Sequence, residues 1–216
     1  MKKLWRQSIS FFALGLLLPF FSSFTTAEDK QLKVGDKAPI FEAFDDDGKL
    51  WKSAYYEGKK ILVVYFYPAA MTGGCTKQAC SFRDDKINLN NLDVKVIGIS
   101  GDDPSNLKIF RKAHDLNFIL LADPDGIVAK KFGVPINDGG SIKRIIDGNE
   151  ITLFRGVTTA RWTFIIDLNG KILHINNQVN AENDSKNVLK IINEYKSESV
   201  LSASSAYLNE VKRRRE

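Results

Sequence analysis

Cysteine is scarce in this chain, and both copies lie in one short stretch. Among 216 residues there are two cysteines, Cys75 and Cys80, with four residues between them. A disulfide-stabilised scaffold needs several pairs spread along the chain, so that class is excluded. The two histidines, His114 and His174, lie far from the thiols in sequence, which argues against a zinc site. We expect no metal and no bound cofactor.

The chain also lacks an apolar run of the ~20 residues that a membrane-spanning helix needs. Its apolar stretch from Ile9 to Phe21 follows Lys2, Lys3 and Arg6 and precedes small residues ending at Ala27. This order is typical of a secretory signal peptide at residues 1–27, removed after Ala27, and an uncleaved anchor is the alternative. We expect an exported protein, in the bacterial periplasm, that is not stably inserted in the membrane after cleavage.

Positive charge is in modest excess and is not arranged for nucleic acid. The net charge falls from +5 to +2 without residues 1–27, because that segment holds three basic residues and no acidic one. The surviving excess lies in Lys212 to Arg215. No basic stripe is interleaved with aromatic residues, so we expect no nucleic-acid partner and interpret this cluster as a solvated end. Attachment of the end to a membrane surface is the weaker alternative.

We find no internal repeat and no second domain. The remaining length suffices for one globular domain with a substantial core, which we place at residues 28–196. The Ser-rich segment from Ser197 to Ser205 then sets off a basic tail at residues 197–216, which is able to form a short helix.

Apolar runs alternate with helical patterns through this domain. Ile61 to Tyr67 is a continuous β-branched and aromatic run, typical of a strand buried on both faces. The Asp-Gly and Asn-Gly pairs at 47–48 and 169–170 predict hairpin turns. The order of elements predicts an α/β sandwich with a central mixed sheet flanked by helices. Further strands are expected at 94–99, 118–121, 161–167 and 171–176, helices at about 76–90, from 104, after 126 and around 188–192, and an irregular segment at 134–156.

Cys75 follows a Pro- and Gly-containing loop and falls where the next helix should begin. Unpaired amide groups and the positive end of the helix dipole meet at that point and favour an anion. A thiol placed there should ionise more readily, because the thiolate is the form that is stabilised. Such a thiolate can attack a peroxide or exchange with a disulfide.

Cys80 lies five residues after Cys75, and this spacing does not suit a static disulfide. On one intact α-helix the two Cα atoms would be about 8.6 Å apart, whereas a disulfide needs less than about 7 Å. A bond between them therefore requires the first helical turn to unwind. The spacing also differs from the C-x-x-C of thioredoxin-like oxidoreductases. Two alternatives stay open: a thiol-disulfide oxidoreductase, and a non-catalytic redox-binding module with a resting Cys75/Cys80 disulfide.

Several motifs in this region resemble the peroxiredoxins. Pro68, Thr72 and Cys75 reproduce the pattern Pro-x-x-x-Thr-x-x-Cys, and Cys80 matches the second cysteine of the bacterioferritin-comigratory-protein or Q-type branch. The resemblance runs from about Val34 to Tyr195, with further matches at 35–39, 76–79, 82–84, 123–126 and 161–170.

The resemblance implies a thioredoxin-like fold and a thiol-dependent peroxidase that reduces hydrogen peroxide and organic hydroperoxides. Cys75 would be oxidised to a sulfenic acid, and Cys80 would resolve it to an intramolecular disulfide. A thioredoxin-like dithiol protein would restore both thiols. Thr72 would position thiolate and peroxide, Pro68 would shield the sulfur, and Arg161 would stabilise the negative charge. We expect a monomer, with a dimer as the alternative.

Two features depart from the family pattern. Gly73 stands where many relatives have proline, which predicts a looser loop and easier unwinding. The chain between Gly133 and Arg161 is longer than is usual for the branch, which predicts a different partner surface or oligomeric contact.

Overall fold

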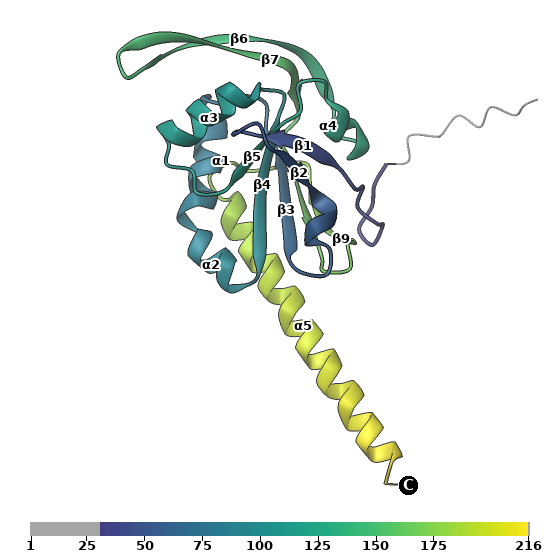
Figure 1. Ribbon diagram of the computed structural model, residues 1–216. Helices are drawn as coiled ribbons and strands as arrows, with labels where there is room; N and C mark the ends of the chain where they lie inside the picture. Colours follow the sequence, from purple (N-terminus) through teal and green to yellow (C-terminus); the bar gives the residue numbers. More distant parts are fainter. Residues whose placement is uncertain (1–30, 216) are drawn as a thin grey trace, which may run out of the picture.

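A computed structural model describes residues 31–215, so the predicted signal peptide at 1–27 lies outside the described residues. A seven-stranded mixed sheet runs through the domain in the order β2-β1-β5-β4-β3-β8-β9 (Figure 1). The three central strands β3, β4 and β5 are parallel, and the strands added on either side are antiparallel to their neighbours. The strands are β1 (Glu42–Asp45), β2 (Leu50–Lys52), β3 (Ile61–Phe66), β4 (Val94–Ser100), β5 (Ile119–Ala122), β8 (Trp162–Ile166) and β9 (Ile172–Asn176).

All six residues of β3 are buried, as its continuous apolar run predicts. Side chains alternate along a strand, so Val63 and Tyr65 join the core on one face, whereas Val64 and Phe66 join the core on the other. Residues of four helices complete the first core and residues of one short helix complete the second, which confirms a mixed sheet flanked by helices. The first face carries α1 (Gly73–Asp84), α2 (Lys86–Asn91), α3 (Pro104–Ala113) and α5 (Asp184–Arg213), and the second carries α4 (Ile127–Lys131) and the 3-10 turn η1 (Ser53–Tyr56).

The helix expected at about 76–90 is two helices. It begins earlier than predicted, at Gly73, and α1 ends at Asp84. Asp85 separates it from α2, and the Asp85 amide closes the last turn of α1 on the Ser81 carbonyl. The break lets α2 pack Leu89, 1% exposed, into the same core as α1.

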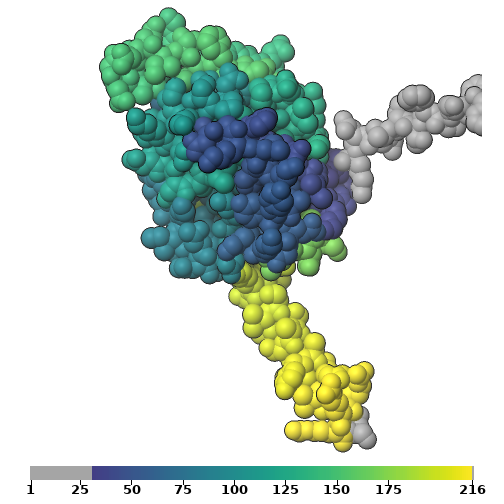
Figure 2. Space-filling view, viewed as in Figure 1, coloured from purple at the N-terminus to yellow at the C-terminus, as the bar shows by residue number. Residues whose placement is uncertain are grey.

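The segment expected to be irregular is a regular hairpin, so that prediction was wrong. β6 (Ile136–Ile146) and β7 (Asn149–Thr159) pair along their length as a separate two-stranded sheet, which we call the arm. The turn is Asp147-Gly148, and both residues have positive φ, at 49° and 80°. This is the hairpin turn that Asp-Gly favours, and the glycines elsewhere in the segment obscured it. The arm crosses one end of the domain and stands out from its surface (Figures 1 and 2).

The Ser-rich segment does not interrupt the last helix. Helix α5 continues through it to Arg213, so the proposed boundary at Ser197 is not a break in secondary structure. The hydroxyls of Ser197, Ser199 and Ser202 donate to carbonyls three or four residues earlier, which satisfies them inside the helix. Ile192 is the last buried residue of α5, and the helix beyond it projects away from the domain (Figure 1).

Candidate active site

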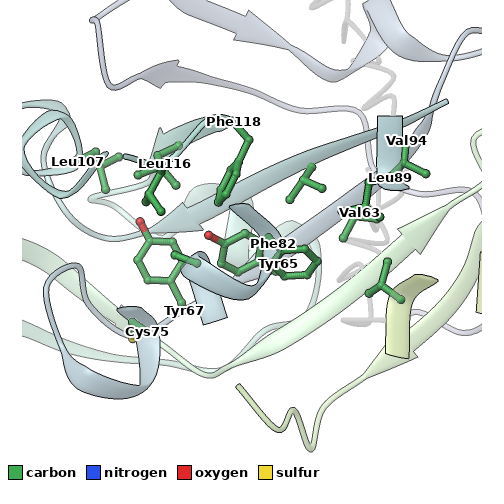
Figure 3. Close-up of a cluster of buried hydrophobic side chains, with 14 of the residues drawn as sticks. Val63, Tyr65, Tyr67, Cys75, Phe82, Leu89, Val94, Leu107, Leu116 and Phe118 are labelled. Atoms are coloured by element: carbon green, nitrogen blue, oxygen red, sulfur yellow. The ribbon is translucent and has the colours of Figure 1, made fainter. Parts of the chain in front are cut away.

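The carboxyl end of β3 leads through a loop into α1 and so places the predicted site residues together. Pro68 is half-buried in this loop, and Thr72 occupies the N-cap position of α1. Cys75 is the third residue of the helix and is only 1% exposed. It joins the core on the helical face, and its turn of helix lies beside Tyr67 (Figure 3). The thiol thus lies in the first helical turn, as the sequence predicted, where free amide groups favour an anion.

Arg161 faces this thiol from the sheet. It immediately precedes β8, and its Nη2 lies 3.3 Å from the Sγ of Cys75. By its position at a strand end alone, Arg161 would be expected on the surface, yet it is half-buried against the sulfur. A guanidinium stays protonated at physiological pH, so it supplies a fixed positive charge and hydrogen-bond donors beside the thiol.

Three buried side chains hold Arg161 in place. The Oε1 of Gln78 accepts a hydrogen bond of 2.5 Å from Arg161 Nη1. The Nε2 of Gln78 donates to Oδ2 of Asp184 at 2.7 Å, and the hydroxyl of Thr163 donates to the same oxygen at 2.7 Å. The guanidinium cannot turn away without breaking bonds in a buried network, where unpaired groups are costly.

Asp184 begins α5 and is buried beneath this network. Burial raises the pKa of its carboxyl above the ordinary 3.8, and hydrogen bonds from Thr163 and Gln78 and the charge of Arg161 oppose the rise. The donors and the nearby charge therefore only partly offset the effect of burial on this carboxyl.

Sequence reasoning missed Gln78 and Asp184 as site residues. Gln78 lies three residues after Cys75, which places the two on one helical face, and this spacing could have indicated it. Asp184 is 106 residues further along the chain than Gln78 and has no local pattern that points to the site. Only the packing of α1 against α5 brings them together.

The hydroxyl of Thr72 is oriented by the loop itself. It donates to the carbonyl of Ala69 at 2.9 Å and makes no side-chain cap to the helix. The helix-capping role that its position suggests is therefore absent. With its proton committed to Ala69, the oxygen offers lone pairs as an acceptor, which suits a group that carries an O–H, such as a hydroperoxide.

The loop is also anchored from β4. Asp102, 0% exposed, accepts hydrogen bonds of 2.8 Å from the amide of Ala70 and from the hydroxyl of Ser100. Asp102 lies just before α3, whose N-cap is Asp103, and the Asp102 side chain turns to the loop. The hydroxyl of Thr159, at the end of β7, donates to the Tyr67 carbonyl at 2.9 Å. The segment that follows β4 and the end of β7 thus both fix the loop.

Cys80 lies on the same helix as Cys75 and is partly exposed, and both thiols are free. An intact helix separates the two Cα atoms by about 8.6 Å. The structure therefore holds the unbonded arrangement that the spacing predicts, and bonding requires part of α1 to unwind.

Two glycines keep the solvent side of the site uncovered. Gly73 and Gly74 are exposed at the start of α1. A Cβ added at Gly74 would lie 3.3 Å from Nη2 of Arg161, a tight contact, whereas one at Gly73 would meet nothing within 4 Å. The absence of a side chain at Gly74 therefore leaves room for Arg161 beside Cys75.

Hollows in the described part of the chain are found away from Cys75. One of about 290 Å³, lined by residues such as Phe41, Leu62 and Ile166, is at the amino end of β3, opposite Cys75. Within residues 31–215 no three His, Cys, Asp or Glu side chains are grouped to hold a metal ion. No helix in this part of the chain is both long and apolar enough to cross a bilayer.

Comparisons with known proteins agree with this geometry. Residues 34–175 match the AhpC/TSA family. The chain is 37% identical to chloroplastic peroxiredoxin Q of Populus jackii over 82% of this chain and 76% of the relative. It is 38% identical to peroxiredoxin Bcp of Escherichia coli K12, over 76% of this chain and 97% of the relative.

A solved structure is similar over nearly its whole length. The peroxidoxin BcpB of Mycobacterium tuberculosis superposes with a TM-score of 0.63 and 30% identity, covering 76% of this chain and 98% of that one. The expected resemblance and the thioredoxin-like fold are thereby confirmed. The chain belongs to the AhpC/TSA family and, within it, to the peroxiredoxins of the Q/Bcp branch, thiol-dependent peroxidases with a peroxidatic cysteine.

Proposed function

We propose that Cys75 is the peroxidatic cysteine of this peroxidase and that Cys80 resolves it to an intramolecular disulfide. The observation that carries the assignment is the 3.3 Å contact between Arg161 Nη2 and the Cys75 sulfur at the start of α1. The free amides at the start of α1, the helix dipole and the Arg161 guanidinium all converge on this one atom, where negative charge develops during the reaction. Cys80 has no comparable partner among the hydrogen bonds of the described residues, which supports the secondary role.

In the first step the Cys75 thiolate attacks one oxygen of the hydroperoxide. An S–O bond forms as the O–O bond breaks, and the leaving oxygen takes a proton and departs as an alcohol, or as water from hydrogen peroxide. Sulfur becomes a sulfenic acid, and the peroxide gains two electrons. Arg161 donates to the reacting oxygens, Thr72 accepts the hydrogen bond of the peroxide O–H, and Pro68 shields the sulfur from water.

In the second step the first turn of α1 unwinds and the Cys80 thiolate attacks the Cys75 sulfur. The S–S bond forms, the S–O bond breaks, and the hydroxide leaves as water with one proton. A thioredoxin-like dithiol then exchanges with this disulfide, which restores both thiols and leaves the donor oxidised. Both electrons consumed by the peroxide are thus returned by the donor.

The two other readings of the thiols gain no support from the structure. A resting disulfide would need the cysteines closer than an intact helix allows, and both are free. A general thiol-disulfide oxidoreductase does not need a buried Cys75 paired with an arginine that a glutamine and an aspartate hold in place.

The test is peroxide consumption by the reduced domain, with Cys75→Ser and Cys80→Ser as a matched pair. Wild type should turn over with a dithiol donor. Cys75→Ser should lose all consumption, whereas Cys80→Ser should consume one equivalent and stop at the sulfenic acid. Full turnover by Cys75→Ser would refute the assignment of the peroxidatic thiol, and normal cycling by Cys80→Ser would refute that of the resolving thiol.

We also propose that the chain is exported to the periplasm, on the basis of the basic, apolar and small-residue order of residues 1–27. A cytosolic thioredoxin could not reach it there, so its reductant would be a dithiol protein of the same compartment. Mass spectrometry of protein from the periplasmic fraction should find Glu28 as the first residue. Intact Met1 to Ala27 on a cytosolic protein would contradict the proposal.

A further inference from the structure

The arm contacts the loop that carries the site. Arg144, half-buried on β6, donates from Nε to the carbonyl oxygen of Met71 at 2.9 Å. Its Nη1 donates to the main chain of Lys143 at 2.8 Å, which folds the side chain back along the strand. Met71 lies just before Thr72, four residues before Cys75. Arg144 therefore holds the loop before α1 at Met71, close to the point where unwinding of the helix has to begin.

Met71 has a conformation that needs such support. Its φ is 59°, in the left-handed region that side-chain-bearing residues rarely adopt. Residues in such regions persist only where their surroundings fix them. Asp102 fixes the amide of Ala70 before it, and Arg144 fixes the carbonyl of Met71 itself. Without the hydrogen bond from Arg144, the loop would lose the restraint on Met71, the loop residue with the unfavourable backbone conformation.

The arm is a firm support because β7 is attached to the body of the domain. The amide Nδ2 of Asn106, on α3, donates to the Phe154 carbonyl at 2.5 Å. The amide of Gly156 donates to the Gly101 carbonyl at 2.9 Å, and Leu153 is 0% exposed. β6 is placed by its pairing with β7, in which Arg144 lies opposite Ile151. The position of Arg144 is thus set by the body and not by the loop it holds.

We propose that Arg144 is a positioning residue that holds the Met71 loop closed and slows the unwinding that brings oxidised Cys75 to Cys80. The inference rests on the proposed roles of those two cysteines. A closed loop leaves the sulfenic acid in the peroxide site for longer. There a second peroxide can convert it to a sulfinic acid, with one further oxygen transferred to sulfur and one alcohol or water released. Arg144 would therefore set the ratio of disulfide to sulfinic acid at a given peroxide concentration.

The experiment compares Arg144→Ala, Arg144→Lys and Lys143→Ala in rapid-mixing assays. Samples are quenched by alkylation and weighed by mass spectrometry, which separates the thiol, disulfide and sulfinic forms. Loss of one hydrogen bond of ordinary net strength should make disulfide formation roughly threefold to tenfold faster in Arg144→Ala. The sulfinic fraction should fall by a similar factor, while the reaction of Cys75 with the first peroxide stays within about twofold, since that step uses the closed loop that still predominates. Arg144→Lys, which keeps a donor and a charge, should lie between the two.

Lys143→Ala is the matched control, because Lys143 pairs with Glu150 across the same hairpin and does not touch the loop. It should behave as wild type in both steps. Disulfide formation in Arg144→Ala at the wild-type rate would overturn the proposal. An equal acceleration in Lys143→Ala would also overturn it, because the effect would then come from the stability of the arm. Failure of the proposed cysteine roles would look different: no variant, nor wild type, would form a peroxide-dependent Cys75–Cys80 disulfide.

Discussion

Gly73 is the position where unwinding of α1 can be made harder without disturbing the thiolate. It is the first residue of the helix, where proline is favoured because the amide there has no helical acceptor. Thr72 before it has φ −100° and ψ 149°, which a following proline permits. A Cβ at Gly73 would meet nothing within 4 Å. Gly73→Pro should therefore fit the closed state without strain.

The expected size of the effect of Gly73→Pro comes from the conformational freedom of the state in which the first turn of α1 has unwound. Replacing glycine by proline at a compatible position stabilises the ordered form by about 0.4–1 kcal/mol, because the opened chain has fewer conformations. That corresponds to roughly twofold to fivefold fewer opened molecules, so disulfide formation should slow by the same factor. Gly73→Ala should act in the same direction through helix propensity, with a smaller effect at a helix end.

The assay mixes reduced protein with excess peroxide and follows the two steps separately by alkylation and mass. The reaction with peroxide should be unchanged in both Gly73 variants, and only the later step to the disulfide should slow. Disulfide formation as fast as in wild type, in both variants, would refute the reasoning. It would mean that Cys75 meets Cys80 by a movement that leaves the first turn of α1 intact.

Three further outcomes are expected. Arg161→Lys should lower the rate of the reaction with peroxide by about 10²-fold in the same assay, because a lysine cannot contact both the Cys75 sulfur and Gln78. A loss below about threefold would show that Arg161 does not act in the first step. Because burial raises the pKa of Asp184 above 3.8, its stabilising contribution is present below that pH and is lost as the pH rises through the folded-state value. Urea unfolding should show that the free energy of unfolding of wild type, relative to that of Asp184→Asn, falls between about pH 3.5 and about pH 7. The same difference between the two proteins at both pH values would contradict a raised pKa for Asp184. A chain ended after residue 196 should keep its activity and its melting temperature within about 4 °C, since Ile192 is the last buried residue of α5; a larger drop would show that the projecting helix contributes to stability.

The sequence predicted the sheet and the position of Cys75 because both depend on local pattern. β3 is apolar at every residue, which indicates burial on both faces, and the glycines before Cys75 mark a helix start. The pairing of Cys75 with Arg161 was reached only through the resemblance, since 86 residues separate them. Asp184, which holds the arginine through Gln78, had no signal at all, because its role exists only once α5 packs against α1.

The arm and the last helix were misjudged for a different reason. In both segments, glycine or serine residues that favour loops in a sequence are part of a regular strand pair or helix in the structure. Asp147 and Gly148 form the turn that two long paired strands require, and the other glycines of the segment from 136 to 159 lie inside those strands. The serines of α5 satisfy their hydroxyls on the preceding turn of helix. Composition alone could not separate these roles from loop formation, because the same residue types favour turns when no partner strand or helix is present.

The packing of α1 sets how far unwinding can go. Ala79 and Phe82 are 0% exposed in the core, and Gln78 is held by Arg161 and Asp184. Everything from Gln78 onward is therefore anchored, and Cys80 with it. Residues 73–77 have fewer ties to the body: Cys75 packs in the core and contacts Arg161, and Lys77 forms an exposed ion pair with Glu182. In the proposed cycle Cys75 therefore travels to a stationary Cys80, while Arg161 stays with Gln78 on the anchored helix. We therefore expect disulfide formation to separate the Cys75 sulfur from Arg161 and to leave the rest of the site assembled, so that reduction need only rewind one turn of α1.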